Sequence, residues 1–311
     1  MHNFLVQIPP SIVDGITTGA IYALMALGYT LVYGVLRLIN FAHSEVFMVG
    51  TFASLFTLHA LGITKTPTGL AIVGVFILIT VAAVAGSSIM AVLVERIAYR
   101  PLRKRNSSSL ANLISAIGVS FFLQEVYALR YGRDLIPFPR ILNKTVLFHI
   151  GLAEVRLDKV VVVVVALVMM FFLDRFVNGT RLGRGIRAVA QDSSTAVLMG
   201  VNIDRIVTLT FLLGGAMAGV AAMLYGMFYE VTQYNIGFVI GIKGFTAAVL
   251  GGIGNIRGAL LGGFVLGLVE TFGGAIFHAQ WVDVVSFSVL VLVLLFRPTG
   301  ILGESLQRAK A

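Results

Sequence analysis

The sequence predicts an all-α integral membrane protein, a polytopic bundle of about eight to ten transmembrane helices. Of its 311 residues, 58% are hydrophobic and only 12% are charged, whereas about one quarter of an ordinary soluble domain is charged. Long uncharged runs such as 66–94 contain roughly the 20 residues that a helix needs to cross the hydrocarbon core. Composition and run length together therefore favour membrane-spanning helices.

Nine apolar segments account for these runs within a single transmembrane domain covering residues 1–311. We expect crossings at about 12–36, 41–62, 69–94, 109–129, 159–177, 206–229, 236–253, 257–278 and 282–297. With the N-terminus outside, most of the 23 Lys and Arg residues fall in inner loops, as the positive-inside rule requires. A re-entrant pair within 236–278 would instead give an even number of crossings.

Two longer loops are expected, one on each side of the membrane. The outer loop, at about 130–158, contains short alternating pieces such as 145–150 and forms either a small packed cap or a solvated connection. The inner loop covers about 178–205. The chain has no cysteine, so neither loop is stabilised by a disulfide. We expect no cleavable signal peptide, because no basic residue precedes Arg37.

A cluster of polar residues interrupts the apolar pattern between Gly34 and Gly50. Residues 43 and 45 point about 200° apart on a helix, so His43 and Glu45 are not expected to share a metal ion. Asn40 is predicted to cap the second crossing. Asn40, His43 and Ser44 then share one face, which either stabilises the reversal or lines a substrate pathway or gate. Glu45 lies off that face and is expected to pair with Arg37.

The inner loop at 178–205 is predicted to form two short helices. Hydrophobic residues recur at helical spacing from Ile186 onward, Asp192 or Ser193 can cap the second helix, and Gly200 can end it. One interpretation is a solvated connector attracted to anionic lipid. The other is a coupling helix, a short cytoplasmic segment that docks on a partner and transmits its movement.

Charged and small residues within the crossings also need partners. Because an isolated charge costs roughly 2.5–3.5 kcal/mol on insertion scales, we predict an intramembrane ion pair between Lys243 and Glu270. In an ion-coupled secondary transporter the same residues would instead form a proton relay. Glycines four residues apart, such as Gly215 and Gly219, predict close helix contacts, either within this chain or with a second permease.

The sequence excludes most enzyme classes. It contains no HExxH, GxSxG or GxxxxGK[ST] motif, so we expect neither hydrolytic catalysis nor nucleotide binding by a P-loop. The net charge of +9 follows the loops, which argues against a nucleic-acid partner. If ATP drives this protein, a separate subunit must bind it.

Four stretches resemble the membrane permeases of the branched-chain amino-acid ABC importers, in the order expected for that family. They are GYTLVYGVLRLINFAHSEVFMVG (28–50), RAVAQDSSTAVLMGVNIDR (187–205), AAVLGGIGNIRGALLGG (247–263) and FRPTGILG (296–303). Ser44 departs from the family pattern, which more often has glycine there. We expect this serine to make a tight helix contact less favourable.

The resemblance implies a multi-pass subunit of the bacterial inner membrane and places ATPase docking on the inner loop, at Arg187, Ala188, Asp192 and Gly200. Its implied partners are a similar second permease in a heterodimer, two cytoplasmic ATPases that bind ATP and Mg, and a periplasmic solute-binding protein. The expected cargo is a branched-chain or other neutral amino acid, carried by alternating access. Related permeases carry urea or short amides, which remains an alternative. No metal or cofactor is expected on this chain.

Overall fold

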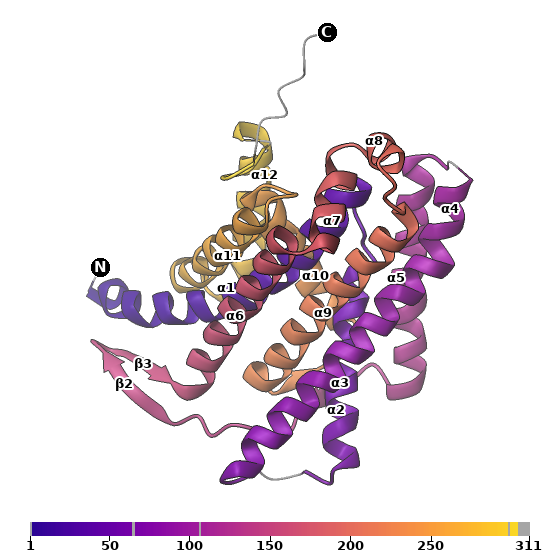
Figure 1. Cartoon of the computed structure of the whole chain (residues 1–311). Helices are drawn as coiled ribbons and strands as arrows, with labels where there is room; N and C mark the ends of the chain where they lie inside the picture. Colours follow the sequence, from indigo (N-terminus) through magenta and orange to yellow (C-terminus); the bar gives the residue numbers. More distant parts are fainter. Residues whose placement is uncertain (1, 64–65, 106, 298, 304–311) are drawn as a thin grey trace.

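The computed structural model describes residues 2–63, 66–105, 107–297 and 299–303, and the chain is predominantly helical (Figure 1). Each of the nine segments predicted to cross the membrane contains a helix. These helices are α1 (His2–Leu36), α2 (His43–Ala60), α3 (Leu70–Val94), α5 (Ser109–Tyr131), α6 (Leu157–Gly179), α9 (Ile203–Tyr229), α10 (Ile236–Gly251), α11 (Ile256–Phe277) and α12 (Val282–Phe296). The all-α polytopic prediction is therefore confirmed.

The helices differ in length. Within the described residues, six helical segments are long and apolar enough to cross a membrane: Gln7–Leu36, Leu70–Lys104, Ser109–Tyr131, Leu157–Gly179, Ile203–Tyr229 and Ile256–Phe277. The second of these joins α3 to a π-helical turn (Glu95–Tyr99) and to α4 (Arg100–Lys104) without a break. By contrast, α10 and α12 are apolar but have only 16 and 15 residues.

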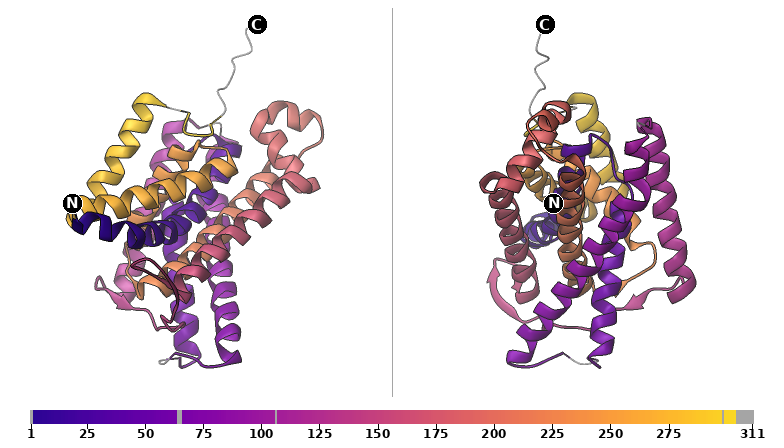
Figure 2. Two further views of the ribbon diagram at one scale, coloured as in Figure 1. Left: turned by 90° about the vertical axis from the view of Figure 1, so that its left-hand side faces the viewer. Right: turned by 45° about the vertical axis from the view of Figure 1, so that its right-hand side comes forward.

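Helices α1 and α9 form the centre of the bundle. In their most apolar 18-residue windows, 83% and 72% of the residues are buried, against 17% in α3 and 28% in α5. The outer helices therefore bury one stripe and leave large apolar side chains on the other face, as expected for helices that face lipid. Helix α5 runs along the edge of the bundle (Figure 2, right).

Glycines bring the central helices together. A Cβ on Gly215 or Gly219 of α9 would lie 2.9 or 2.8 Å from the backbone of α3, at Ser88 or Val84. On α11, a Cβ at Gly263 would lie 2.5 Å from Cα of Ala23 in α1. These glycine faces therefore make contacts within this chain, where the absence of a side chain permits close backbone approach. Their use in a permease dimer stays a prediction.

The outer loop is partly packed and partly exposed. It contains an antiparallel hairpin of β2 (Val146–Ile150) and β3 (Ala153–Arg156), so the strand pattern expected near 145–150 is confirmed. Strand β1 (Ile136–Pro137) pairs instead with β4 (Val231–Thr232), which follows α9. Phe138 and Ile141 are buried, whereas every residue of β2 is exposed. The first half of the loop therefore packs on the bundle, whereas in the hairpin β3 packs on α1 and β2 is exposed (Figure 1).

Short helices gather at the opposite end. Helices α7 (Arg181–Gln191) and α8 (Ser193–Leu198) lie near the top of Figure 1 with α4, whereas the α2–α3 turn and the β2–β3 hairpin lie below. The two short helices predicted in the inner loop are therefore present. Their separation from the outer loop agrees with a bundle whose two ends face different compartments.

Candidate functional site

The reversal between α1 and α2 differs from the predicted helix cap. Helix α2 begins at His43 with Ala42 at the N-cap position and no side-chain cap. Asn40 lies two residues too early to cap the helix, because residues 41 and 42 form a turn. Its Oδ1 instead accepts a hydrogen bond of 2.9 Å from the hydroxyl of Tyr99. Asn40 therefore joins the reversal to the helix that follows α3, and its predicted capping role is wrong.

Glu45 is the most deeply buried acid of this region, with no exposed surface. It does not pair with Arg37, which corrects the sequence prediction. Its Oε1 accepts hydrogen bonds from Ser44 Oγ (3.1 Å), Ser120 Oγ (3.1 Å) and Gln124 Nε2 (3.0 Å). Ser120 and Gln124 belong to α5, so this carboxylate holds α5 against α2.

The second oxygen of Glu45 has a different environment. Within the described part of the chain, Oε2 is buried and has no hydrogen-bond partner. Gly237, in the first turn of α10, lies beside it, since a Cβ on that glycine would be 3.0 Å from Oε2. A buried carboxylate oxygen without a donor is costly unless another group binds it. This oxygen is the strongest indication of a binding function in the bundle.

The other two gate candidates face different helices. His43 packs edge-on against Tyr29 with ring centroids 4.7 Å apart, and its ring fills the space that Gly28 leaves on α1. Ser44 lies against Gly237 and Gly241 of α10. The serine thus makes a close helix contact after all, because the facing helix supplies the glycines. The gate role of Asn40, His43 and Ser44 stays a prediction.

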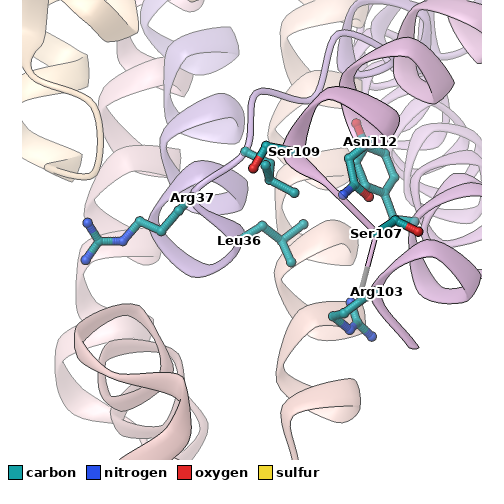
Figure 3. A pocket seen from close by; sticks show the side chains of 8 residues that line it. Leu36, Arg37, Arg103, Ser107, Ser109 and Asn112 are labelled. Carbon is teal, nitrogen blue, oxygen red and sulfur yellow. The ribbon is translucent and has the colours of Figure 1, made fainter. Parts of the chain in front are cut away.

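A cavity of about 380 Å³ opens near the reversal (Figure 3). It lies between the end of α1, the segment around α4 and the start of α5. Its walls are mostly polar and carry two arginines. The lining residues are Leu36, Arg37, Leu38, Tyr99, Arg103, Ser107, Ser109 and Asn112. Tyr99 connects this cavity to Asn40, although Asn40 itself is not part of the wall.

Buried charges near the cavity fix α4 to α9. Glu95 has no exposed surface, and its Oε1 lies 3.2 Å from Nη2 of Arg103. The same nitrogen lies 2.5 Å from Asp204 Oδ1, at the start of α9, and Arg100 also approaches Asp204 at 3.3 Å. The positive-inside rule predicts these arginines only as inner-loop residues and names no carboxylate partner. Glu95 precedes them on the same continuous helix, and Asp204 belongs to α9.

Asp192 starts α8 as predicted. Its Oδ1 accepts hydrogen bonds from the backbone amides of Ser194 and Thr195, at 2.8 and 3.2 Å. Hydrogen bonds from these two residues, first of all from the Ser194 side chain, lower the pKa of Asp192 to about 2. After α8, Gly200 adopts φ +83°, a conformation that suits glycine. Both residues therefore shape the loop.

Arg187 holds the other short helix in place. It donates hydrogen bonds to the carbonyl oxygen of Val177 and to Oδ1 of Asn178, at the end of α6. Ala188 is partly buried. Leu198 and Met199, at the end of α8, are 86% and 80% exposed. The loop thus presents an apolar tip on a rigidly attached helix. This arrangement suits a docking element, and the coupling role of these residues stays a prediction.

An intramembrane charge cluster joins the last helices. Lys243 Nζ lies 2.7 Å from Oε1 of Glu270, as the sequence led us to expect, and 2.9 Å from Oδ1 of Asp283. The hydroxyl of Tyr22 donates to the same Glu270 oxygen at 3.1 Å. The cluster therefore connects α1, α10, α11 and α12. Lys243 pairs with both Glu270 and Asp283, whereas the sequence predicts only the pair with Glu270.

No cluster of three or more His, Cys, Asp or Glu residues suited to a metal ion occurs in the described ranges. The groups around Glu45 and the cavity are hydrogen-bond donors and acceptors, a carboxyl group and two guanidinium groups. Such a site can bind and release a small polar molecule without changing it covalently.

Comparison with known proteins identifies the family. The sequence model of the family described as "Branched-chain amino acid transport system / permease component" matches residues 11–294. The chain is 45% identical to the high-affinity branched-chain amino acid transport system permease protein BraD of Pseudomonas aeruginosa, over 98% of this chain and 97% of that protein. It is also 45% identical to LivH of Escherichia coli K12, a permease protein of the same description, over 94% of each chain.

A more distant match covers half of the chain. The probable branched-chain amino acid transport permease protein LivM of Methanocaldococcus jannaschii is 27% identical over 46% of each chain. The family match spans nearly every helix described above, from α1 to α12. The chain therefore belongs to the family of branched-chain amino acid transport system permease components.

Proposed function

We propose that this chain is the membrane-spanning permease of an ATP-driven, binding-protein-dependent importer of branched-chain or other neutral amino acids. The observation that carries the proposal is the 45% identity to BraD and LivH over nearly the full length of each chain. It acts as a transporter subunit and not as an enzyme, because the cargo crosses the membrane unchanged. We place it in the bacterial inner membrane.

The importer contains several further subunits. Two cytoplasmic ATPases bind ATP and Mg and dock on the loop at 178–205, where Leu198 and Met199 are exposed. A periplasmic binding protein delivers the amino acid to the opposite end. The weaker match to a LivM protein supports a second, similar permease, which completes a heterodimer with this chain. Arg187, Ala188, Asp192 and Gly200 form or support the ATPase contact.

Transport follows alternating access. Closure of the two ATPases on ATP displaces α7 and α8, and the two permeases move between an outward-facing and an inward-facing arrangement. Because Arg187 bonds α7 to the end of α6, movement of the loop passes directly to a transmembrane helix. The substrate pathway runs beside the reversal of α1 and α2, where Asn40 and Ser44 contact neighbouring helices.

The two alternatives are less well supported. BraD and LivH, the relatives at 45% identity, are branched-chain amino acid permeases by their names, which does not favour urea or a short amide as cargo. Ion-coupled secondary transport would use Lys243 and Glu270 as a proton relay. Pairing among Lys243, Glu270 and Asp283 accounts for these charges without such a relay.

Reconstitution in liposomes tests the proposal. The purified importer should accumulate leucine only with both ATPases, ATP and the loaded binding protein. The matched control is the same preparation with a nonhydrolysable ATP analogue. Leucine uptake driven by a proton or sodium gradient without ATP would contradict the proposal and support secondary transport. Urea uptake that exceeds leucine uptake would shift the substrate class.

A further inference from the structure

The buried face of α5 is a polar stripe that runs from the cavity into the bundle. Along it, residues 112, 116, 120 and 124 recur every four positions, so they share one side of the helix. Three of the four side chains are polar, namely Asn112, Ser120 and Gln124, and all four are buried. We call this stripe, which meets α2 at Glu45 through Ser120 and Gln124 and reaches the cavity at Asn112, the α2–α5 seam. Polar side chains are rare on helix faces inside a membrane, because each unsatisfied polar group there costs free energy.

One end of the seam is open. Asn112 and Ser109 belong to the wall of the 380 Å³ cavity, together with Tyr99 and Arg103 (Figure 3). From Asn112 to Gln124 the helix rises by about 18 Å. Ser120 is near the midpoint of α5, which covers Ser109–Tyr131. The seam therefore connects the cavity at one end of the bundle to the middle of the membrane.

The inner end of the seam is Glu45. Its Oε1 accepts from Ser120 and Gln124, while Oε2, on the side of Gly237, has no donor among the described residues. First turns of two helices, α2 and α10, lie beside this carboxylate. The partial positive charge of helix N-termini favours an ionised carboxylate, whereas burial away from water disfavours it. The site thus supplies a carboxyl group with free acceptor capacity, which a bound cation would hold in its ionised form.

Glycine lets α10 pack closely beside that oxygen. A side chain at position 237 would meet both Oε2 of Glu45 and the backbone of Ser44. A buried carboxylate with an unsatisfied oxygen matches a ligand that carries several N–H donors and a positive charge. The α-ammonium group of an amino acid has both properties.

We propose that the α2–α5 seam is the inner half of the substrate route, and that Glu45 binds the ammonium group of the amino acid on it. This inference rests on the proposed function and adds to it a contact residue and a path. In the present arrangement Ser120 and Gln124 satisfy one carboxylate oxygen and close the seam. Separation of α5 from α2 exposes Glu45 to the cavity, through which the amino acid leaves.

The first experiment replaces Glu45 in the complete reconstituted importer. Glu45→Gln keeps the size of the side chain and an acceptor for Ser120, but it removes the charge. We expect the initial rate of leucine uptake to fall at least about tenfold, because charge-assisted hydrogen bonds are about twice as strong as neutral ones and this one lies away from water. ATP hydrolysis stimulated by the binding protein should stay within about twofold, since the hydrogen bonds of Glu45 in the described residues go to Ser44, Ser120 and Gln124 and not to the coupling loop.

The matched control is Glu125→Gln on α5, next to Gln124 in sequence. Glu125 is exposed and pairs only with Arg133 at 2.9 Å within the described residues, so the same chemical change should leave uptake unaltered. Wild-type uptake rates in Glu45→Gln would overturn the proposal. If Glu45→Gln fails to assemble with its partners, the protection of Ser120→Cys alone, described below, decides the question.

The second experiment uses the absence of cysteine from this chain. Ser120→Cys places a single thiol beside Glu45, and its reaction with the cationic reagent methanethiosulfonate ethylammonium is followed on this subunit during ATP-driven turnover. Leucine-loaded binding protein should slow the labelling at least about fivefold relative to the empty binding protein, because the amino acid occupies the site. This protection should disappear when Glu45→Gln is added.

The outcomes separate the two proposals. If the wild-type importer takes up leucine but leucine does not protect Ser120→Cys from labelling, the assignment of Glu45 is overturned and the proposed function stays intact. Protection that persists with Glu45→Gln would also overturn it, because a movement of α5 alone would then explain the effect. Absence of any leucine uptake by the wild-type importer would instead contradict the proposed function, and with it this inference.

Discussion

Nη2 of Arg37 donates a hydrogen bond of 2.7 Å to the carbonyl oxygen of Ala190, which joins the reversal after α1 to the last turn of α7. Arg187 secures the same helix to the end of α6. Helix α7 is thus connected on one side to the segment that leads to Glu45 and on the other to a transmembrane helix. These two arginines therefore link the loop at 178–205 to the α1–α2 reversal and to α6.

Loss of the Arg37 side chain should weaken coupling. Arg37 has φ +54°, so Arg37→Gly keeps the backbone conformation without strain and removes only the side chain and its bond. We expect the amount of leucine transported per ATP hydrolysed to fall about threefold to tenfold, a coupling free energy of about 1 kcal/mol. Uptake and phosphate release are measured on the same proteoliposomes.

Arg133→Gly serves as the control for Arg37, because Arg133 is an exposed arginine at the opposite end of the bundle. It should leave the ratio of transport to hydrolysis unchanged. A wild-type ratio in Arg37→Gly would show that α7 moves the reversal by another contact.

Replacement of Asp192 should separate its capping role from its charge. Asn is as good a helix N-cap as Asp, whereas Ala cannot accept the amide hydrogen bonds. We therefore expect Asp192→Ala to speed amide hydrogen exchange in α8 and to uncouple ATP hydrolysis from uptake. Asp192→Asn should keep α8 formed. Uncoupling in Asp192→Asn with normal exchange would assign the effect to the charge at the ATPase contact.

The cap should be insensitive to pH in the working range. The pKa of Asp192 is lowered to about 2 by its hydrogen bonds with Ser194 and Thr195, below its ordinary value of 3.8. Because the folded-state pKa is depressed, the cap contributes fully above about pH 4 and is lost only as the pH falls toward 2. Hydrogen exchange in residues 193–198, corrected for intrinsic rates, should therefore be constant from pH 5 to 8. A protection that changes within this window would contradict the capping geometry.

Removal of Lys243 should destabilise the bundle. Lys243→Met leaves Glu270 in a nearly dry site without its cation, a situation that costs about 3–5 kcal/mol. The thermal unfolding midpoint in detergent should fall accordingly. The double variant Lys243→Met/Glu270→Gln should recover part of the loss, since it removes the uncompensated charge. The control is Lys104→Met, an exposed lysine whose replacement should stay within about 0.5 kcal/mol.

A methyl group added at the α1–α11 contact should also lower the stability of the bundle. The Cβ of Gly263→Ala would lie 2.5 Å from Cα of Ala23, and backbone atoms cannot move aside as a flexible side chain can. We expect a loss of about 1–3 kcal/mol in the free energy of unfolding. Gly74→Ala on α3 is the matched control, because nothing lies within 4 Å of its Cβ. Equal stability of the two variants would argue against close packing of α1 on α11.

Local features of the structure follow from local sequence. The helices in the nine predicted segments could be located because each is marked by a run of apolar residues, and six helical segments of the described residues are long and apolar enough to cross a membrane. The α7–α8 loop could be predicted because the cap at Asp192 and the left-handed turn at Gly200 depend on neighbours within four residues. The Lys243 and Glu270 pair followed from the cost of leaving either charge alone in lipid.

Rotation and depth of the helices were decided only by the tertiary structure. The sequence places Glu45 off the face of Asn40 and Ser44, yet it cannot say that α5, more than 70 residues later, presents Ser120 and Gln124 to it. For the same reason the sequence wrongly predicts an ion pair between Arg37 and Glu45, whereas Arg37 donates a hydrogen bond to the carbonyl oxygen of Ala190. Periodicity gives the direction of a side chain relative to its own helix, whereas its partner depends on packing between helices that are distant in sequence. The sequence by itself therefore determined the helices, the α7–α8 loop and the family. The packing of the helices decided that Glu45 accepts hydrogen bonds from Ser120 and Gln124 of α5.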